Sequence, residues 1–243
     1  MLRTHLERIE HMVAGEHHIQ PDQFHCPGWL RKTAGEQRLP VSLAIVVAIV
    51  LQVLLPGRYA IHPHLLMPGL EFALLAALLV ANPNRICRES RILRLTGLVL
   101  ATVISVANFY SAAHLVDALV QGTAGDDPSL LLLTGASIWG TNVIVFALWY
   151  WEFDRGGPVA RALARKPYPD FQFVQMQCPE LTPPDWEPYF VDYLYLSFTN
   201  ATAFSPTDVL PLSRWAKMAM MTQSAVSLAT VALVIARAVN ILK

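Results

Sequence analysis

The residues of this sequence that could bind an ion or carry a proton stand inside otherwise apolar segments. Glu71 lies within "MPGLEFALL", and the stretch "VDYLYLSFTNATAFSPTDV" holds Asp192, Asn200, Thr202 and Asp208. A carboxylate in hydrocarbon costs free energy, so it marks an ion or proton pathway or pairs with a polar group of a neighbouring helix. These five residues are therefore predicted to line a transport pathway. The alternative is that they only hold helices together.

Helical spacing places the polar groups of the second stretch on defined faces. Tyr193, Ser197 and Asn200 recur at helical intervals, so they share one face. A polar face avoids lipid, which predicts that other helices enclose this segment, either as a pathway lining or as a polar seam that fixes packing. In the last apolar segment, the polar residues spaced to face one common neighbour are Gln223, Ser224, Ser227 and Thr230.

A second candidate for proton chemistry is a histidine–aspartate pair. His114 and Asp117 are close enough in sequence to be neighbours on one helix face, near the end of an apolar segment. An aspartate beside an imidazole orients and charges it, so the pair is a candidate proton relay. The alternative is a hydrogen bond at the membrane interface, where polar side chains reach water.

Patterns typical of metal sites and enzymes are missing from the sequence. Histidines and glutamates mix in the N-terminal "LRTHLERIEHMVAGEHH", but no HExxH arrangement occurs, and the apolar residues there predict an amphipathic helix lying on the membrane surface. GxSxG, P-loop and Rossmann fingerprints are also missing. We therefore predict no enzyme activity, no metal and no cofactor.

The amino-acid composition indicates whether this chain folds in water or in a membrane. Of its 243 residues 54% are hydrophobic and only 15% charged, and the mean hydropathy is +0.40. Such a chain is too apolar for a soluble domain of this length. The formal net charge is zero, which argues against a nucleic-acid partner. Membrane lipid is the expected partner, and a second copy of the chain, forming a homo-oligomer, is left open. The three cysteines have no ligand-like spacing and are interpreted as free thiols.

Apolar runs divide the chain into four regions. A polar tail, 1–39, precedes a four-helix transmembrane region, 40–151, and a proline-rich linker, 152–187, precedes a pore-like segment, a Ser-Pro-Thr-Asp turn and a final transmembrane helix, 188–243. The predicted fold is an all-α polytopic bundle of about six spans. The expected spans are 41–55, 65–81, 95–120, 130–151, 188–204 and 216–242. Trp149, Tyr150 and Trp151 are expected to form an aromatic belt at the headgroups.

The positions of arginine and lysine predict the orientation. Basic clusters precede the first span, separate the second from the third, and follow the fourth, so all three clusters can face the cytoplasm together with the N-terminus. A crossing by 188–204 would return the C-terminus to the cytoplasm, and this six-span topology is preferred. Arg214 and Lys217 disagree with it. In the alternative, 188–204 dips into the membrane and returns, and the C-terminus ends outside.

Two resemblances bear on function. The last half of the chain, with "NVIVFALWYWEFD", "FVDYLYLSFTNATAFSPTDV" and a final helix ending "RAVNIL", resembles the bacterial membrane proteins grouped as domain of unknown function thirteen forty-five. The segments that carry the likeness include Asp192, Ser205, Asp208 and Asn240. This resemblance implies a multi-pass inner-membrane protein without assigning an activity. The sequence departs from that family at 200–202, where a Gly-Met-Thr-like run is usual.

The same stretch also resembles, more weakly, the pore end of two-helix potassium channels. Where those channels carry a glycine-containing filter that aligns backbone carbonyls, residues 202–208 hold no glycine and include Pro206. The expected function is therefore channel-like or transporter-like without potassium selectivity. The alternative is a non-transporting membrane scaffold or accessory subunit. The same stretch also suggests that Asp208 caps the final helix.

Overall fold

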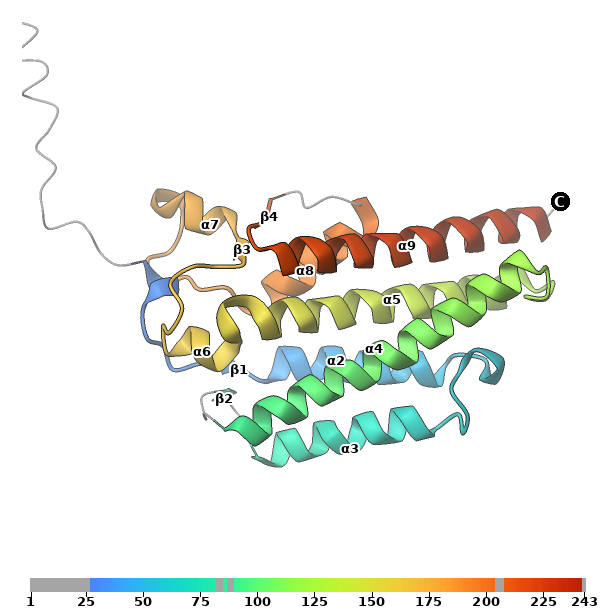
Figure 1. Cartoon of the computed structure of the whole chain (residues 1–243), viewed down its shortest axis with the longest axis horizontal. Coiled ribbons are helices and arrows are strands. Elements are labelled where there is room, and N and C mark those ends of the chain that lie inside the picture. The colour runs from blue at the N-terminus through green and yellow to red at the C-terminus, as the bar shows by residue number, and fades with distance from the viewer. Residues whose placement is uncertain (1–26, 82–84, 87–89, 204–207, 242–243) are drawn as a thin grey trace, which may run out of the picture.

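Six helices lie side by side, and shorter elements cover one end of the bundle that they form (Figure 1). The computed structural model describes residues 27–81, 85–86, 90–203 and 208–241. The six helices are α2 (Leu39–Val53), α3 (Leu66–Ala81), α4 (Arg91–Val120), α5 (Pro128–Phe153), α8 (Phe190–Ala203) and α9 (Arg214–Ile241). Helix α5 is central and packs against α2, α4, α8 and α9. The described chain is mostly helical, which confirms the predicted fold class at that level.

Three of these helices are long and apolar enough to cross a membrane. They are α4, α9 and α5, the last with the turn that continues it to Gly156. Helices α2 and α3 are equally apolar but have only 15 and 16 residues. At 1.5 Å per residue such helices are about 24 Å long at most, against a hydrocarbon core of about 30 Å. Six full spans are therefore not confirmed, although a helix overlaps each of the expected segments.

Local capping explains where several helices begin. The Asp127 side chain accepts hydrogen bonds from the N–H groups of Ser129 and Leu130, and Pro128 occupies the first turn of α5. At α9, the hydroxyl of Ser213 accepts from the Ala216 N–H at 3.4 Å. Ser213 directly precedes α9, which begins at Arg214. The prediction that Asp208 caps this helix is therefore wrong, because strand β4 (Leu210–Pro211) separates them.

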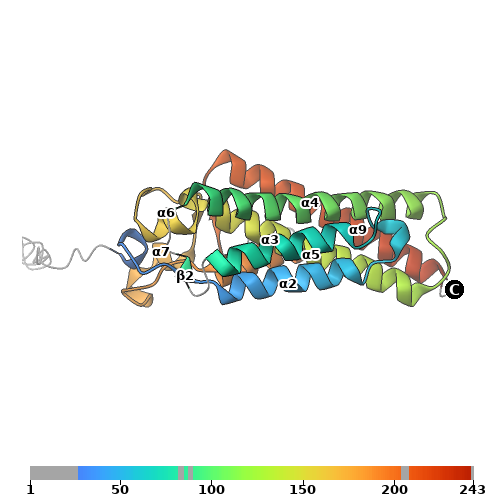
Figure 2. The ribbon, with the colours of Figure 1, turned by 90° about the horizontal axis from the view of Figure 1, so that it is seen from below.

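Residues 27–38 and 154–189 fold over one end of the bundle, and we call them the cap. They contain η2 (Gly28–Leu30), β1 (Glu36–Gln37), η4 (Asp154–Gly156), α6 (Pro158–Ala162), β3 (Phe171–Gln172), α7 (Val174–Gln177) and η5 (Pro179–Leu181). Strand β1 pairs with β2 (Arg85–Ile86), so the connection between α3 and α4 joins the same end. The predicted linker is thus a folded part of the structure (Figure 2). Its prolines start short helices and prevent long ones.

Helix α8 enters the bundle from the cap, and the chain then returns to the cap. Strand β4 follows α8 and pairs antiparallel with β3 of the cap. Helix α9 therefore starts at the cap end and runs to the opposite end, where the C-terminus lies (Figure 1). The 14 residues of α8 are also too few to cross a bilayer. A fifth crossing is therefore not confirmed, and Arg214 and Lys217 lie at the cap end, where α9 starts.

The opposite end is closed by two connections that contact each other. The short helix η3 (Gly57–Tyr59) follows α2, and Arg58 Nη2 donates to the Ala124 carbonyl, in the turn between α4 and α5, at 2.6 Å. At the same end, Arg237 of α9 forms an ion pair with Asp126 at 3.0 Å. The connection between α2 and α3 is thereby held against the connection between α4 and α5 at this end of the bundle.

Candidate functional site

The polar side chains of α8 contact α5 and α9. Asn200 Nδ2 donates to Gln223 Oε1 at 2.8 Å and to the Met220 carbonyl at 3.0 Å. Gln223 Nε2 donates to Ser197 Oγ at 2.6 Å, and Tyr150 Oη donates to Gln223 Oε1 at 2.6 Å. The side chains of Tyr150, Ser197, Asn200 and Gln223 are at most 2% exposed. Other helices therefore enclose this face of α8, as predicted, and Gln223 is the residue that joins all three.

Further hydrogen bonds extend this cluster along α9. Asn142 Nδ2 of α5 donates to Ser227 Oγ at 3.0 Å, and Ser224 Oγ donates to Asn200 Oδ1 at 3.3 Å. Ser197 Oγ donates to the Val143 carbonyl at 2.6 Å. The predicted common face of α9 is thus in contact with both α5 and α8. We call the following residues the polar network: Asn142, Tyr150, Ser197, Asn200, Gln223, Ser224 and Ser227.

Glu71 lies apart from the polar network, between α2 and α3. Its side chain is 0% exposed, and Gln52 Nε2 donates to Glu71 Oε2 at 3.0 Å. Glu71 Oε1 has no hydrogen-bond partner among the described residues, and neither amide atom of the buried Asn108 on α4 has one. A small cavity, about 10 Å³ and lined by Gln52, His64 and Ser111 among others, lies in the same part of the bundle. It has room for about one water molecule.

The remaining predicted pathway residues lie elsewhere. Asp192 is half-buried at the start of α8, where its carboxylate accepts from the Tyr189 N–H at 2.8 Å. Thr202 is exposed and donates to the Phe198 carbonyl of its own helix at 2.7 Å. Asp208 is exposed beside the cap. Residues 204–207, which complete the segment compared with a potassium filter, lie outside the described residues.

The five predicted pathway residues therefore do not line one route through the described structure. Asn200 lies in the polar network, Glu71 lies on the far side of α5 between α2 and α3, and Asp192 and Asp208 lie at the cap end. Polar residues spaced along one helix predicted a common face correctly. Polar residues of different segments were predicted to share one pathway only because they are polar, and the structure does not bring them together.

His114 and Asp117 contact other groups than each other. Both are exposed near the end of α4. The His114 ring lies 4.2 Å from the Tyr110 ring, centroid to centroid, and Asp117 accepts a hydrogen bond from Gln121 Nε2 at 2.8 Å. No hydrogen bond joins the imidazole of His114 to the carboxylate of Asp117 in the described structure. The pair therefore lies at a surface, close to where α4 ends.

The aromatic residues expected at the lipid headgroups instead point into the protein. Tyr150 is 0% and Trp151 6% exposed. Trp149 Nε1 donates to Ser105 Oγ of α4 at 2.9 Å, and Trp151 Nε1 donates to Glu36 Oε2 of the cap at 2.6 Å. The predicted belt is wrong because α5 is central, so its end is surrounded by the cap and by neighbouring helices.

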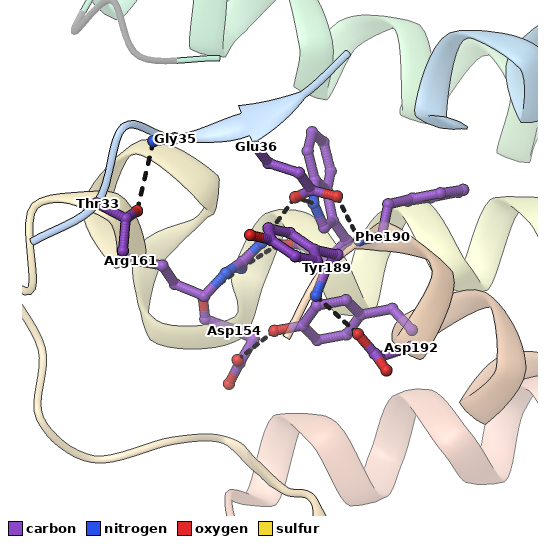
Figure 3. A network of polar contacts seen from close by, with 10 residues as sticks. Thr33, Gly35, Glu36, Asp154, Arg161, Tyr189, Phe190 and Asp192 are labelled. Atoms are coloured by element: carbon purple, nitrogen blue, oxygen red, sulfur yellow. Dashed lines mark hydrogen bonds and ion pairs between the residues drawn. The ribbon is translucent and has the colours of Figure 1, made fainter. Parts of the chain in front are cut away.

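A cluster of charged side chains that the sequence argument did not single out joins the cap to α5 and α8 (Figure 3). The Glu36 carboxylate accepts from Trp151 Nε1 and from the Phe190 N–H. Arg161 Nη2 lies 4.0 Å from Glu36 Oε2, and Arg161 Nη1 donates to the Trp151 carbonyl at 2.6 Å. Glu36 is 7% and Arg161 5% exposed. Burial raises the pKa of the Glu36 carboxyl from its ordinary 4.5, opposed by these hydrogen bonds and by the Arg161 charge.

A second buried acid anchors the other side of the cap. Asp154 is 0% exposed, and its Oδ2 accepts from Tyr193 Oη of α8 at 2.6 Å. Its Oδ1 accepts from the N–H groups of Asp170 and Phe171 at 2.8 and 3.3 Å. Asp170 Oδ1 accepts in turn from Trp215 Nε1 of α9 at 2.8 Å. Each buried oxygen therefore has a donor, as a packed interface requires.

Metal binding finds no support in the described residues, where no three His, Cys, Asp or Glu side chains converge. The histidines of the N-terminal tail, and the amphipathic helix predicted there, lie outside the described residues. Cys178 is a free thiol, as predicted. No family model matches the chain, and neither the curated proteins nor the solved structures include a match to it. The contacts within the chain therefore carry the functional argument.

Proposed function

We propose that this chain is a multi-pass protein of a bacterial inner membrane that acts as a non-transporting scaffold or accessory subunit. The three long apolar helices and the resemblance of the last half of the sequence support the membrane assignment. The observation that carries the proposal is the polar network, in which the side chains best suited to a pathway bond to one another.

A pathway residue must exchange its partner for a passing ion or for water. Asn200, Gln223 and Ser197 are at most 2% exposed, and they bond to each other and to backbone carbonyls. Separating them would leave buried donors and acceptors unsatisfied, at about 1–3 kcal/mol for each group. Hydrogen bonds between membrane helices stabilise association. The polar residues of α8 and α9 thus favour a structural role over a conducting one.

The charge distribution supports placing the cap in the cytoplasm. Arg31, Lys32, Arg155, Arg165 and Lys166 belong to the cap, and Arg85, Arg91, Arg94, Arg214 and Lys217 lie at the same end of the bundle. The opposite end holds Arg58 and Arg237 with Asp126 and Asp127. An excess of arginine and lysine is typical of cytoplasmic segments. With α8 re-entrant, the N-terminus would then be cytoplasmic and the C-terminus external.

Flux measurements test the proposed lack of transport. Purified protein is reconstituted into liposomes that enclose proton- and potassium-sensitive dyes, and protease protection verifies insertion. Imposed gradients of either ion should decay as slowly as in protein-free liposomes. Faster decay in the unmodified protein, altered by Asn200→Ala but unaffected by Thr222→Ala, would overturn the proposal. Thr222 is a suitable control because it is exposed and bonds only to the Met218 carbonyl of its own helix.

One observation favours a second function, proton or cation transport through Glu71. Its Oε1 atom and the Asn108 amide are buried without hydrogen-bond partners in the described residues, and buried polar groups of that kind need an explanation. If this function holds, Glu71→Gln abolishes a pH-dependent flux while Asp117→Asn, at an exposed acid of α4, preserves it. If the unmodified protein shows no such flux, the second function is rejected and the scaffold role is kept.

A further inference from the structure

A cavity of about 270 Å³ lies at the cap end of the bundle, apart from the polar network. Residues of α2, α3, α4, α5 and α6 line it, and Figure 2 shows α6 at the end where α2 and α4 start. Its inner wall is apolar, with Ile45, Leu75, Leu78 and Leu100 each at most 5% exposed. We call it the cap-end cavity. Its volume is near the lower limit of ligand sites, which begin at about 300 Å³.

The charged residues that line this cavity are mostly cationic. Among the described residues they are Arg38, Arg91, Arg94, Arg165 and Glu152, four arginines against one acid. Arg91, Arg94 and Arg165 are exposed, whereas Arg38 is only 7% exposed. The cavity therefore combines an apolar interior with arginines that remain accessible. Guanidinium groups bind phosphate through charge-assisted, often bidentate hydrogen bonds.

Glu152 makes this a constructed site rather than a surface patch of arginines. It lines the cavity while only 8% exposed. The guanidinium groups of Arg161, Arg94 and Arg38 lie near enough to interact with it electrostatically. Glycines leave room for it, because a Cβ atom at Gly97 would lie 3.0 Å from Glu152 Oε1.

The backbone next to Glu152 is shaped in the same way. Gly157 has a φ of 98°, and a Cβ atom there would lie 2.9 Å from the Glu152 carbonyl oxygen and 3.1 Å from its Oε2. A side chain at this position would be both strained and in contact with the acid. The glycines at 97 and 157 thus leave room for the acid beside the cavity. The exposed Arg91 and Arg94, which line the same cavity, can contact an anionic ligand.

The geometry points to the cap-end cavity as a binding site for an amphiphile with a phosphate-bearing headgroup, its hydrocarbon chain against the apolar wall and its phosphate on Arg91 and Arg94. The apolar wall disfavours free phosphate, since a small hydrated anion gains nothing from it. Basic sites between membrane helices recognise anionic lipid headgroups in this way. The inference concerns a site outside the polar network, so it holds whether or not the chain transports an ion.

Binding of soluble short-chain lipids to the full-length protein in detergent tests this site. Dioctanoyl phosphatidic acid is titrated against the protein and compared with dioctanoylglycerol, which lacks phosphate, and with inorganic phosphate, which lacks the chains. We expect the phosphatidic acid to bind at least about tenfold more tightly than either, as one lost charge-assisted contact implies. Equal affinity for dioctanoylglycerol overturns the phosphate assignment, and equal affinity for inorganic phosphate overturns the amphiphile assignment.

Paired variants separate this site from general attraction to the basic end. Arg91→Gln with Arg94→Gln removes two exposed cavity charges and should weaken phosphatidic acid binding at least about tenfold. Arg214→Gln with Lys217→Gln removes two exposed charges at the same end outside the cavity and should leave binding unchanged. An equal loss in both pairs overturns the proposal. Leu93→Trp, at a half-buried position of the cavity wall, should also weaken binding in folded protein, and unchanged affinity would mean that the chains bind elsewhere.

Discussion

The carboxylate of Glu36 accepts a hydrogen bond from the backbone N–H of Phe190, which joins two residues 154 positions apart in sequence. Phe190 is the first residue of α8, and the first N–H groups of a helix have no partner within the helix. A negative charge there also interacts favourably with the helix dipole. Strand β1 thus helps to fix the start of α8, and the cap and the helix bundle are stabilised together.

Replacing Glu36 by alanine should destabilise the protein. Trp151 Nε1 and the Phe190 N–H would lose their acceptor in a buried setting, and Arg161 would lose its ion pair with Glu36. We expect a loss of about 2–4 kcal/mol, because two buried donors would be left without an acceptor. Thermal unfolding in detergent measures this effect. Asp192→Ala serves as a control at a more accessible acid of the same region, and equal losses in both variants would contradict the assigned role.

The same carboxyl predicts a pH dependence. Burial raises the folded-state pKa of Glu36 above 4.5, its ordinary value, so the folded protein binds this proton more tightly than the unfolded chain. Its contribution to stability is therefore full below pH 4.5 and is lost as the pH rises through the folded-state pKa. The stability difference between wild type and the non-titrating Glu36→Gln should narrow as the pH rises. A difference that widens over that interval would show that the carboxylate is the favoured form.

Hydropathy predicted the long helices well. The segments 130–151 and 216–242 correspond to α5 at Pro128–Phe153 and α9 at Arg214–Ile241. Such segments are long and continuous, so their ends follow from composition and flanking turn residues. The spacing of Ser197 and Asn200 also predicted a face of α8 that other helices enclose. Both successes rest on patterns that are local in sequence.

The path of the chain after α8 and the make-up of the cap depend on contacts between residues that are far apart in sequence. The return of the chain to the cap is fixed by pairing between β3 and β4, and no periodic pattern marks two-residue strands. Glu36 contacts Trp151 across 115 positions. Arg161 was counted only as a charge that sets orientation. The alternation of basic clusters favoured six spans, and the disagreement of Arg214 and Lys217 with that topology was the signal in the sequence for the re-entrant alternative.

Cysteine accessibility can distinguish the re-entrant from the spanning topology. In a variant without its three natural cysteines, Asp208→Cys and Tyr168→Cys should both react with a membrane-impermeant maleimide from the same side. Tyr168 is an exposed residue of the cap, and β4 returns the chain to that end. Asp127→Cys, at the opposite end, should react from the other side. If Asp208→Cys and Asp127→Cys are labelled from the same side, residues 188–204 cross the membrane and the re-entrant topology is rejected.

Gln223 should contribute more to stability than any exposed polar residue of α9. Gln223→Leu leaves Tyr150 Oη and the Asn200 amide with one acceptor fewer and removes both hydrogen bonds that Nε2 donates to Ser197. We expect a loss of about 2–4 kcal/mol, because several buried polar groups lose partners at once. Thr222→Val, at an exposed neighbouring position, should change stability by about 0.5 kcal/mol or less. Similar unfolding temperatures for the two variants would contradict the structural role of the network.

The contact between Gln52 and Glu71 should behave as a coupled pair that joins α2 to α3. Gln52 Nε2 donates to Glu71 Oε2 at 3.0 Å, and both side chains are buried. Gln52→Leu and Glu71→Leu should each lower the unfolding temperature, because each leaves the other residue without its hydrogen bond. The double variant has no orphaned group at this contact, so its loss should be smaller than the sum of the single losses, by about 0.5–3 kcal/mol. Additive losses would mean that the two residues act independently. Additive losses would thus argue against a structural pair. Together with the unpartnered Oε1 of Glu71, they would favour the second function, in which Glu71 binds a proton or cation.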